Sequence, residues 1–237
     1  MKKALFLGGS KGLGLEMAKL ALDEDWKVTI AARSALECEL YKKAAGGVTA
    51  MPLDLEARLI KPITHLGPYG LIVWTAGAHQ EGTLLDLHAE DIDRMVANHL
   101  AGPAKFLLPN LSKSRELKTP VQLVVVASST SYRVRMGEGL YGAVKAAKAQ
   151  FARMLGKELP ESVPGSKVLL AHPGGMNTPF WDGRDQPKLK GFMDPKAVAQ
   201  VIWNEMKAQI TSFDEIHIDR QSGGVPKLVR EIRAPKF

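Results

Sequence analysis

Short apolar runs alternate with longer segments of helical periodicity along most of this chain. The runs are almost continuously hydrophobic and rich in β-branched residues, as expected for strands that are covered on both faces of a parallel sheet. We predict seven strands, over residues 3–7, 27–32, 48–52, 70–75, 121–127, 167–171 and 215–218. The segments between them predict helices over residues 12–25, 35–45, 89–111, 139–159 and 195–209.

The alternation of strands and helices determines the expected fold. In the segment 139–159, one apolar face is marked by residues at helical spacing: Leu140, Val144, Ala147, Phe151 and Leu155. Strands that alternate with such helices are typical of a doubly wound α/β sheet. We therefore expect a Rossmann-type, mainly parallel, seven-stranded sheet with helices on both faces, formed by a single domain over residues 1–237. Ligands of such sheets bind beyond the carboxyl ends of the strands.

Length and composition agree with this fold. The chain has 237 residues, which fit one large domain, and its hydrophobic content of 45% is ordinary for a protein with a buried core. The single cysteine, Cys38, excludes an internal disulfide and indicates a reducing compartment. No stretch approaches the roughly 18 apolar residues of a membrane helix, and the apolar run near Met1 is too short for a signal peptide. We expect a cytoplasmic protein that does not enter membranes.

The net charge of +7 raises the question of a nucleic-acid partner. Basic residues are mixed with acidic ones along the chain and form no long run, which argues against such an interface. The most basic stretch is the tail 220–237, where five basic residues are opposed only by Glu231. We interpret it as a solvated tail, with nucleic-acid binding through it as the alternative. A small molecule is the expected partner.

A glycine-rich turn follows the first predicted strand and opens the first helix. Glycines at 8, 12 and 14 permit a tight turn and a close approach of the backbone to a pyrophosphate. The helix N-terminus supplies free N–H groups and partial positive charge to the anion. No Gly-Lys-Ser/Thr sequence follows, so a P-loop nucleotide site is not expected. The turn predicts dinucleotide binding by Gly8, Ser10, Lys11, Gly12, Leu13 and Gly14.

The residues after the second predicted strand indicate which dinucleotide is bound. NAD-binding proteins usually place Asp or Glu there to accept hydrogen bonds from the ribose hydroxyls. Here Ala32 ends the strand and is followed by Arg33 and Ser34. A 2′-phosphate is repelled by a carboxylate and is bound bidentately by a guanidinium. We therefore predict NADP(H), with Arg33 and Ser34 near its 2′-phosphate; a plain surface arginine is the alternative.

Tyr141 and Lys145 lie four residues apart on the predicted helix 139–159, so their side chains share one helix face. A phenol with a pKa near 10 is a poor acid or base at neutral pH. A neighbouring ammonium favours the phenolate and is expected to lower the pKa of Tyr141. The tyrosine can then protonate the alkoxide that develops when a carbonyl is reduced. Taken alone, the same spacing also fits a buried tyrosine beside a solvated lysine.

These two residues form a Y-x-x-x-K motif, and their surroundings resemble the short-chain dehydrogenase/reductase family. Ser128 follows a predicted strand and stands thirteen residues before Tyr141, which is the spacing of the family's serine. The resemblance implies that this serine hydrogen-bonds the substrate carbonyl, with Ser129 as the alternative. It also implies that Asn98 holds a water that links Lys145 to solvent.

The resemblance covers nearly the whole chain and assigns further residues to the cofactor. It implies a contact from Asp54 to adenine, and contacts from residues after the fourth and sixth strands: Ala76, Gly77, Pro173, Gly174 and Thr178. Tyr141 and Lys145 are implied to contact the cofactor as well. The chain departs from the family's pattern at Leu7, where threonine is usual, and at Thr75, where asparagine is usual. Thr75 can still hydrogen-bond, whereas the side chain of Leu7 cannot.

The segment 179–193 is expected to form a lid over the substrate, with Gly183 and Gly191 as its flexible positions. It carries aromatic and charged residues: Phe180, Trp181, Asp182, Arg184, Asp185, Lys188, Lys190 and Phe192. The aromatic residues fit either recognition of an apolar or planar substrate or simple packing of the lid. Arg133 and Arg135 are expected to be solvated, with contact to an anionic substrate as the alternative.

Histidine spacing gives no indication of a metal site. The six histidines form no H-x-x-x-H or H-E-x-x-H pair, so no catalytic metal is expected. His99 is expected to pack between helices rather than to act chemically. The family resemblance implies a homodimer or homotetramer, formed through the helices 89–111 and 139–159.

The sequence therefore predicts an NADP(H)-dependent oxidoreductase that reduces a ketone or aldehyde, or oxidises the matching alcohol. The alternative is a non-catalytic NADP(H) sensor. A sensor would not need its four candidate catalytic residues in these positions: Asn98, Ser128, Tyr141 and Lys145.

Overall fold

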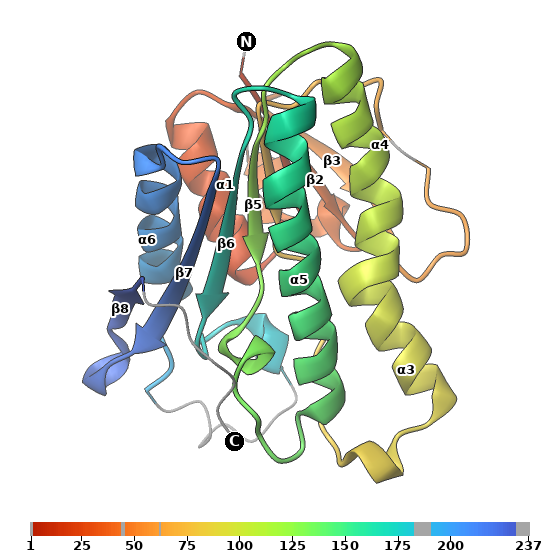
Figure 1. The fold of residues 1–237 in the computed structure, drawn as a ribbon, viewed down its shortest axis with the longest axis vertical. Helices are drawn as coiled ribbons and strands as arrows, with labels where there is room; N and C mark the ends of the chain where they lie inside the picture. The colour runs from red at the N-terminus through yellow and green to blue at the C-terminus, as the bar shows by residue number, and fades with distance from the viewer. Residues whose placement is uncertain (1, 44–45, 62, 183–190, 231–237) are drawn as a thin grey trace.

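A twisted sheet of eight strands forms the centre of the computed structural model, which describes residues 2–43, 46–61, 63–182 and 191–230 (Figure 1). The strand order is β3-β2-β1-β4-β5-β6-β7-β8. Strands β1 to β7 are parallel, and β8 is antiparallel to β7. The strand order reverses between β1 and β4, which makes this the topological switch point where such sheets bind ligands. The predicted Rossmann-type fold is confirmed.

The strands of this sheet agree closely with the apolar runs of the sequence. They are Lys3–Leu7 (β1), Lys27–Ala32 (β2), Val48–Pro52 (β3), Leu71–Trp74 (β4), Gln122–Val126 (β5), Lys167–Pro173 (β6), Phe213–Arg220 (β7) and Pro226–Val229 (β8). The prediction of seven strands missed β8, because this segment was interpreted as part of a solvated tail. Pro226 opens this edge strand, a position where a proline is tolerated in a sheet. Residues 231–237 of the predicted tail lie outside the described residues.

The helices are α1 (Gly12–Asp23), α2 (Glu39–Lys43), α3 (Ala89–Val96), α4 (Gly102–Glu116), α5 (Gly139–Ser162) and α6 (Pro195–Ala208). The predicted helix 35–45 is shorter than expected, because a 3₁₀ turn at Ala35–Glu37 precedes α2. The predicted helix 89–111 is interrupted by a π-helical turn at Ala97–Ala101, between α3 and α4. Helix α6 begins after Asp194, whose carboxylate accepts a hydrogen bond from the backbone N–H of Lys196 at 3.0 Å.

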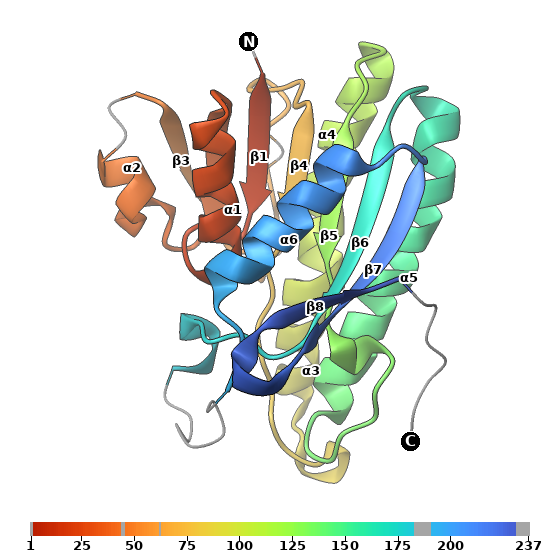
Figure 2. The same ribbon diagram turned by 90° about the vertical axis from the view of Figure 1, so that its left-hand side faces the viewer.

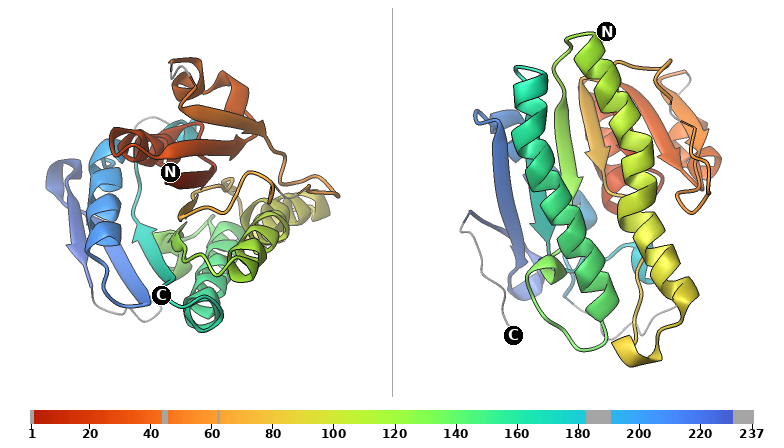
Figure 3. Two further views of the ribbon diagram at one scale, coloured as in Figure 1. Left: turned by 90° about the horizontal axis from the view of Figure 1, so that it is seen from above. Right: turned by 45° about the vertical axis from the view of Figure 1, so that its right-hand side comes forward.

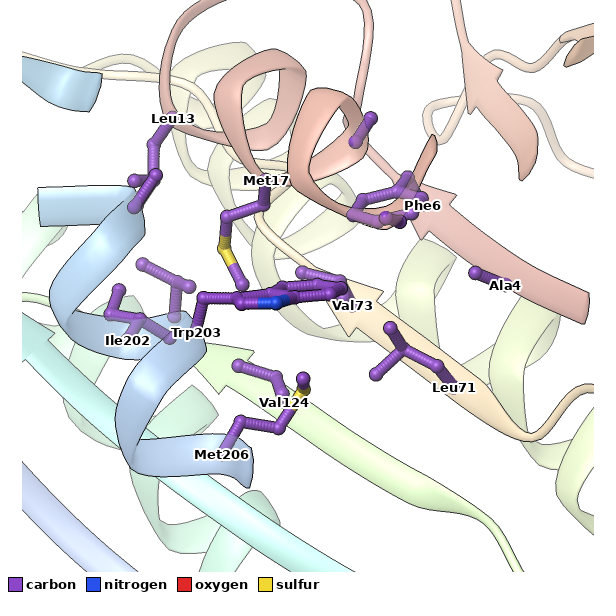
Figure 4. Close-up of a cluster of buried hydrophobic side chains, with 14 of the residues drawn as sticks. Ala4, Phe6, Leu13, Met17, Leu71, Val73, Val124, Ile202, Trp203 and Met206 are labelled. Atoms are coloured by element: carbon purple, nitrogen blue, oxygen red, sulfur yellow. The ribbon is translucent and has the colours of Figure 1, made fainter. Parts of the chain in front are cut away.

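Helices cover both faces of the sheet. Figure 2 shows α1 and α6 in front of one face, and Figure 3 shows α4 and α5 side by side over the other. Alternate residues of a strand point to opposite faces. In β1, Phe6 therefore belongs to the apolar cluster under α1 and α6, whereas Leu5 and Leu7 belong to the cluster under α4 and α5. Met17 and Trp203 pack together in the first cluster, which Figure 4 shows. These two cores hold the strand ends in fixed positions.

Two features are not found in the described part of the chain. None of its helices has the length and apolar character that a membrane crossing requires. The same residues contain no group of three or more His, Cys, Asp or Glu side chains arranged to hold a metal ion.

Candidate functional site

A cavity of about 1330 Å³ lies beyond the carboxyl ends of β1, β4, β5 and β6. Pockets for single small ligands are typically about 300–1,000 Å³, so this cavity has room for a dinucleotide together with a small molecule. Almost all predicted site residues line it: Gly8, Ser10, Lys11, Gly12, Leu13, Gly14, Arg33, Ser34, Ala76, Gly77, Asn98, Ser128, Tyr141, Lys145, Pro173, Gly174 and Thr178. The exception is Asp54, which does not line the cavity; its Oδ1 instead accepts a hydrogen bond from the N–H of Glu56 at 3.0 Å.

The glycine-rich turn after β1 packs tightly against the end of β4. Gly8 has a φ of +94°, and a Cβ atom on it would lie 2.4 Å from the backbone nitrogen of Ala76. A Cβ on Gly14 would lie 2.4 Å from the oxygen of Gly8 and 2.5 Å from Oγ1 of Thr75. Thr75 donates a hydrogen bond to that same oxygen of Gly8 at 2.9 Å, so threonine ties the turn to β4 where the family usually has asparagine.

The N-terminus of α1 fits an anion. Lys11 occupies the N-cap position, and its side chain makes no capping hydrogen bond. The first N–H groups of a helix lack partners within the helix, and they carry a partial positive charge. Because these groups face the cavity behind a glycine turn, the residues present fit the pyrophosphate of a dinucleotide.

Gly14→Ala tests the packing of this turn. We expect the substitution to lower the free energy of unfolding by about 1–3 kcal/mol, because the added methyl group meets backbone that is held in place. Gly47→Ala is the matched control, since the nearest atom to its added Cβ is Cδ2 of Leu22 at 3.7 Å. Urea unfolding of both variants measures the difference. Equal stability of the two variants would contradict the packing described for Gly14.

The end of β2 presents an exposed arginine to the cavity. The side chain of Arg33 is 68% exposed, and its Nη1 lies 3.7 Å from Oε1 of Glu56. An exposed pair at this distance contributes little to stability. The Oγ atoms of Ser34 and Ser10 lie 2.9 Å apart, so the turns after β1 and β2 meet at this point. A guanidinium and two hydroxyl groups are thus available to a phosphate group.

Tyr141 and Lys145 lie on consecutive turns of α5 and are both buried. Nζ of Lys145 lies 5.6 Å from the centre of the Tyr141 ring and donates a hydrogen bond to the oxygen of Ala127 at 3.1 Å. Burial lowers the pKa of Lys145 to about 7. Burial also raises the pKa of Tyr141 well above its usual value, although the hydrogen bond with Ser128 opposes this change. The expected lowering of the Tyr141 pKa is therefore wrong, because desolvation by burial decides the direction of the change.

The structure distinguishes the two candidate serines after β5. Ser128 hydrogen-bonds Tyr141, and its Oγ lies 2.7 Å from Oγ1 of Thr130. Ser129 is almost fully buried, and its Oγ accepts a hydrogen bond from Nη2 of Arg135 at 3.4 Å. Ser128 is thus the serine that shares a hydrogen bond with the tyrosine of the Y-x-x-x-K motif.

Asn98 lies in the π-helical turn between α3 and α4, a type of irregularity that is frequent at functional sites. Its amide nitrogen donates to Oε1 of Glu56 at 2.8 Å and to the oxygen of Arg94 at 2.9 Å. The π turn thus places a fixed amide at the cavity wall. Its implied role in holding a water beside Lys145 stays a prediction.

A second buried lysine, which was not predicted, lies beside the site. Lys148 is fully buried, and its Nζ donates to the oxygens of Trp74 and Ala76 at 3.3 and 3.2 Å. Burial and the charge of Lys145 lower its pKa well below the usual value. Its position three residues after Lys145, on the apolar face of α5, was the signal in the sequence. His99 is buried, with Nε2 3.0 Å from the backbone nitrogen of Ala78 after β4 and its ring 5.8 Å from that of Tyr141 on α5.

Aromatic side chains form the cavity wall next to Tyr141. The ring of His79 lies 4.7 Å from that of Tyr141, 4.8 Å from that of Trp181 and 5.6 Å from that of Phe180. Trp181 in turn lies 5.5 Å from Phe192. Of the predicted lid, Gly183, Arg184, Asp185, Lys188 and Lys190 lie outside the described residues.

Arg133 and Arg135 are ion-paired rather than simply solvated. Nη2 of Arg133 lies 3.3 Å from Oδ1 of Asp219, and Nη1 of Arg135 lies 3.8 Å from Oε2 of Glu138. Both arginines line the cavity, so contact with an anionic substrate stays an alternative.

Comparisons with known proteins agree with this geometry. The profile of a family described as "short chain dehydrogenase" matches residues 2–188. The chain is 27% identical over 216 residues to "Carbonyl reductase family member 4" of Xenopus tropicalis, covering 85% of this chain and 89% of the relative.

Two solved structures illustrate the likeness in fold. One is a 3-ketoacyl-(acyl-carrier-protein) reductase from Brucella melitensis complexed with NADH, with a TM-score of 0.77, 19% identity, and coverage of 94% of this chain and 98% of that one. The other is an alcohol dehydrogenase from the archaeon Thermococcus sibiricus complexed with 5-hydroxy-NADP, with a TM-score of 0.77, 22% identity, and coverage of 96% and 99%. At these identities they support the fold alone.

Proposed function

The chain belongs to the short chain dehydrogenase family, and from that premise we propose that it is an NADP(H)-dependent oxidoreductase of ketones or aldehydes and the matching alcohols. The family binds nicotinamide cofactors and acts as oxidoreductases on CH–OH or C=O groups. When bound, such a cofactor supplies or accepts the hydride. The choice of NADP(H), the carbonyl substrate and the residue roles are the parts that we propose.

The observation that carries the proposal is the arrangement of three side chains in the wall of one cavity. Ser128, Tyr141 and Lys145 line the same cavity as the glycine-rich turn after β1. Ser128 hydrogen-bonds Tyr141, and Lys145 lies beneath the tyrosine ring. A carbonyl oxygen placed between the two hydroxyl groups would accept hydrogen bonds from both. Such preorganised donors stabilise the charge that develops on the oxygen during reduction.

The protonation of Tyr141 suits the reductive direction. Its raised pKa keeps the hydroxyl protonated at neutral pH, so a proton is available for the developing alkoxide. Lys145 has a pKa of about 7 because it is buried, so its charge changes near neutral pH. We propose that Lys145 in its charged form stabilises the phenolate that remains after proton transfer.

The choice of NADP(H) rests on Arg33. No acidic residue stands at the end of β2, and the guanidinium of Arg33 is largely exposed at the cavity wall. Ser10, Lys11 and Ser34 supply further donors nearby. The two similar structures carry one cofactor of each kind, so they do not favour either.

Arg33→Ala tests the cofactor preference. We expect NADPH to bind about 10- to 100-fold more weakly, because charge-assisted hydrogen bonds to the 2′-phosphate are lost. The affinity for NADH should change little, because NADH lacks this phosphate. Fluorescence titration of both cofactors measures the two Kd values. Arg58→Ala is the control, since Arg58 is exposed but does not line the cavity. An unchanged ratio of the two Kd values in Arg33→Ala would contradict the role of this residue.

A panel of aldehydes, ketones and quinones, assayed for NADPH oxidation, tests the proposed function as a whole. The oxidoreductase predicts turnover of at least one class. The second candidate, a non-catalytic sensor, predicts tight cofactor binding without turnover of any of them. The placement of Ser128, Tyr141 and Lys145 around one cavity favours the enzyme.

A homodimer or homotetramer formed through α4 and α5 stays a prediction. Leu108 of α4 and Met154 of α5 are half-exposed apolar side chains, which supports such an interface. The cytoplasmic location and the single-domain organisation likewise stay predictions.

A further inference from the structure

A buried histidine lies directly behind the serine of the candidate site. His172 is the penultimate residue of β6 and is 1% exposed. Its Nε2 lies 2.9 Å from Oε1 of Glu215, on the neighbouring strand β7. Its Nδ1 lies 2.7 Å from Oγ of Ser131 and 3.2 Å from the backbone oxygen of Ser128. The imidazole ring therefore connects a carboxylate on one side with the Ser128 turn on the other.

The backbone oxygen of Ser128 is held from several directions. Oγ of Ser131 donates to it at 2.5 Å, and the N–H of Ser131 donates to it at 3.0 Å. Nδ1 of His172 is the third atom in contact with this oxygen, at 3.2 Å. Because this oxygen is held in place, the backbone of Ser128, which carries the side chain, is held in place as well. The position of Oγ of Ser128 relative to Tyr141 therefore depends on these contacts.

The partners of the two ring nitrogens lie on different strands and turns. Nε2 faces the carboxylate of Glu215, whereas Nδ1 faces Oγ of Ser131 and the backbone oxygen of Ser128. The carboxylate and the carbonyl only accept hydrogen bonds. The hydroxyl of Ser131 donates to the oxygen of Ser128 and so links this oxygen to Nδ1 of His172.

Glu215 is itself fixed in place. Arg153 of α5 donates to its two carboxylate oxygens, at 2.9 Å from Nε and 2.7 Å from Nη2. Burial raises the pKa of Glu215, but the hydrogen bonds from His172 and Arg153 outweigh it and lower the pKa to about 2. Glu215 is thus a carboxylate at neutral pH. Because Arg153 holds this carboxylate, Glu215 in turn fixes the position of Nε2 of His172.

Aromatic packing fixes the plane of the imidazole ring. The ring of His217 is stacked on it with centres 4.8 Å apart and an interplanar angle of 15°. The ring of Tyr132 lies edge-on to both, at 5.6 Å from His172 and 4.7 Å from His217. The ring therefore has little freedom to turn away from Ser128.

Resting on the proposed function, we propose that His172 is a positioning residue: anchored by Glu215, it holds the backbone of Ser128 through Nδ1 and so aims the serine hydroxyl at the substrate carbonyl. His172 does not line the cavity and touches neither substrate nor cofactor in this role. Its effect passes through Ser131 and the carbonyl of Ser128.

Two variants of His172 separate its two hydrogen bonds. In His172→Asn, the amide nitrogen takes the place of Nδ1 and keeps a donor toward Ser131 and Ser128. In His172→Gln, the longer side chain puts its amide at the place of Nε2 and keeps the bond to Glu215 only. Both variants lose the same imidazole ring and the same stacking on His217, so each is the matched control of the other.

Hydrogen exchange of the full-length protein without cofactor is the first readout. The N–H of Ser131 donates to the oxygen of Ser128. We expect it to exchange about fivefold faster in His172→Gln than in His172→Asn, as for the loss of one hydrogen bond. Equal exchange in the two variants would overturn the proposal. This readout does not depend on any enzymatic activity.

The second readout is turnover, with NADPH and phenanthrenequinone as the probe. We expect His172→Gln to lower kcat by up to about 100-fold, as for a misplaced reacting group, with an unchanged Kd for NADPH. His172→Asn should keep kcat within about threefold of the wild type. Equal kcat values in the two variants contradict the proposal. If the wild type reduces no carbonyl at all, the proposed function fails, and the exchange experiment still decides whether His172 holds Ser128.

Ser131 supplies a second pair of variants if a His172 variant does not fold. Ser131→Ala removes the hydroxyl that bridges His172 and Ser128, whereas Ser131→Thr keeps it. We expect faster exchange in the turn at 128–131 and a lower kcat for the alanine variant, with recovery in the threonine variant. An alanine variant that matches the wild type in both readouts would rule out the bridge.

Discussion

Tyr141→Phe is expected to lower kcat for carbonyl reduction by about 10²- to 10⁴-fold, because it removes the group that delivers the proton. The phenol is buried, hydrogen-bonded to Ser128 and protonated at neutral pH, since burial raises its pKa. Phenylalanine keeps the ring that packs against His79 and Phe180. The Kd for NADPH should therefore remain close to that of the wild type. Steady-state kinetics and fluorescence titration measure the two quantities separately.

A matched control distinguishes proton delivery from loss of a buried hydroxyl. Tyr69 is also buried, and its hydroxyl donates to Oγ1 of Thr29 at 3.4 Å, but it does not line the cavity. Tyr69→Phe should keep kcat unchanged. If Tyr141→Phe kept wild-type kcat as well, Tyr141 would not be the proton donor.

Lys145→Met is expected to abolish most activity and, at the same time, to change how stability depends on pH. Lys145 has a pKa of about 7 in the folded protein because it is buried, whereas a lysine in the unfolded chain has a pKa of about 10.4. Between these two values the unfolded state binds more protons than the folded state. The free energy of unfolding of the wild type therefore rises as pH increases through this range.

The Lys145→Met variant lacks this pH-dependent contribution to the free energy of unfolding. Relative to Lys145→Met, the wild type should gain on the order of 4 kcal/mol between pH 7 and pH 10. Lys148 is present in both proteins, so the part of its titration that comes from burial cancels from the difference. Urea unfolding at several pH values in this range measures both curves. Parallel curves would show that Lys145 is not desolvated as the structure indicates.

Most of the fold followed from the sequence because β1 to β6 contain almost continuous apolar runs, whereas β7 has only Ile216 and Ile218 at its centre. The eighth, β8, carries Pro226 and Lys227, which disfavour a strand unless a neighbouring edge is available. Pairing with β7 supplies that edge. Likewise, Gly102 and Pro103 directly after the π turn indicate an irregular helix, but they do not give its type or its position at Asn98. Both features depend on tertiary contacts that local patterns do not contain.

The candidate site was largely predictable for a geometric reason. In a parallel sheet, the residues that follow each strand meet at one edge, so Gly8, Arg33, Ser128 and Gly174 reach the same cavity. Asp54 follows a strand too, but its carboxylate caps the N–H of Glu56 instead. Which serine contacts Tyr141 was also left open by spacing alone.

Buried charge and its consequences were only partly visible in the sequence. Lys148 lies on the apolar face of α5 and His172 in the apolar strand β6, but their partners are visible only in the folded chain. The pKa of Tyr141 is the clearest case. The spacing to Lys145 predicts a lowered value, yet the loss of solvent around the phenol decides the direction.

The transfer of deuterium from NADPH that carries deuterium at both positions of C4 of the nicotinamide tests the proposed function most directly. The purified wild type is incubated with the labelled cofactor and an aldehyde or ketone from the panel, and the product is analysed by mass spectrometry. An NADP(H)-dependent carbonyl reductase predicts an alcohol with deuterium on its carbinol carbon, formed by the wild type and lost in Tyr141→Phe. Consumption of NADPH without deuterium in the alcohol, or equal labelling by wild type and Tyr141→Phe, would contradict it.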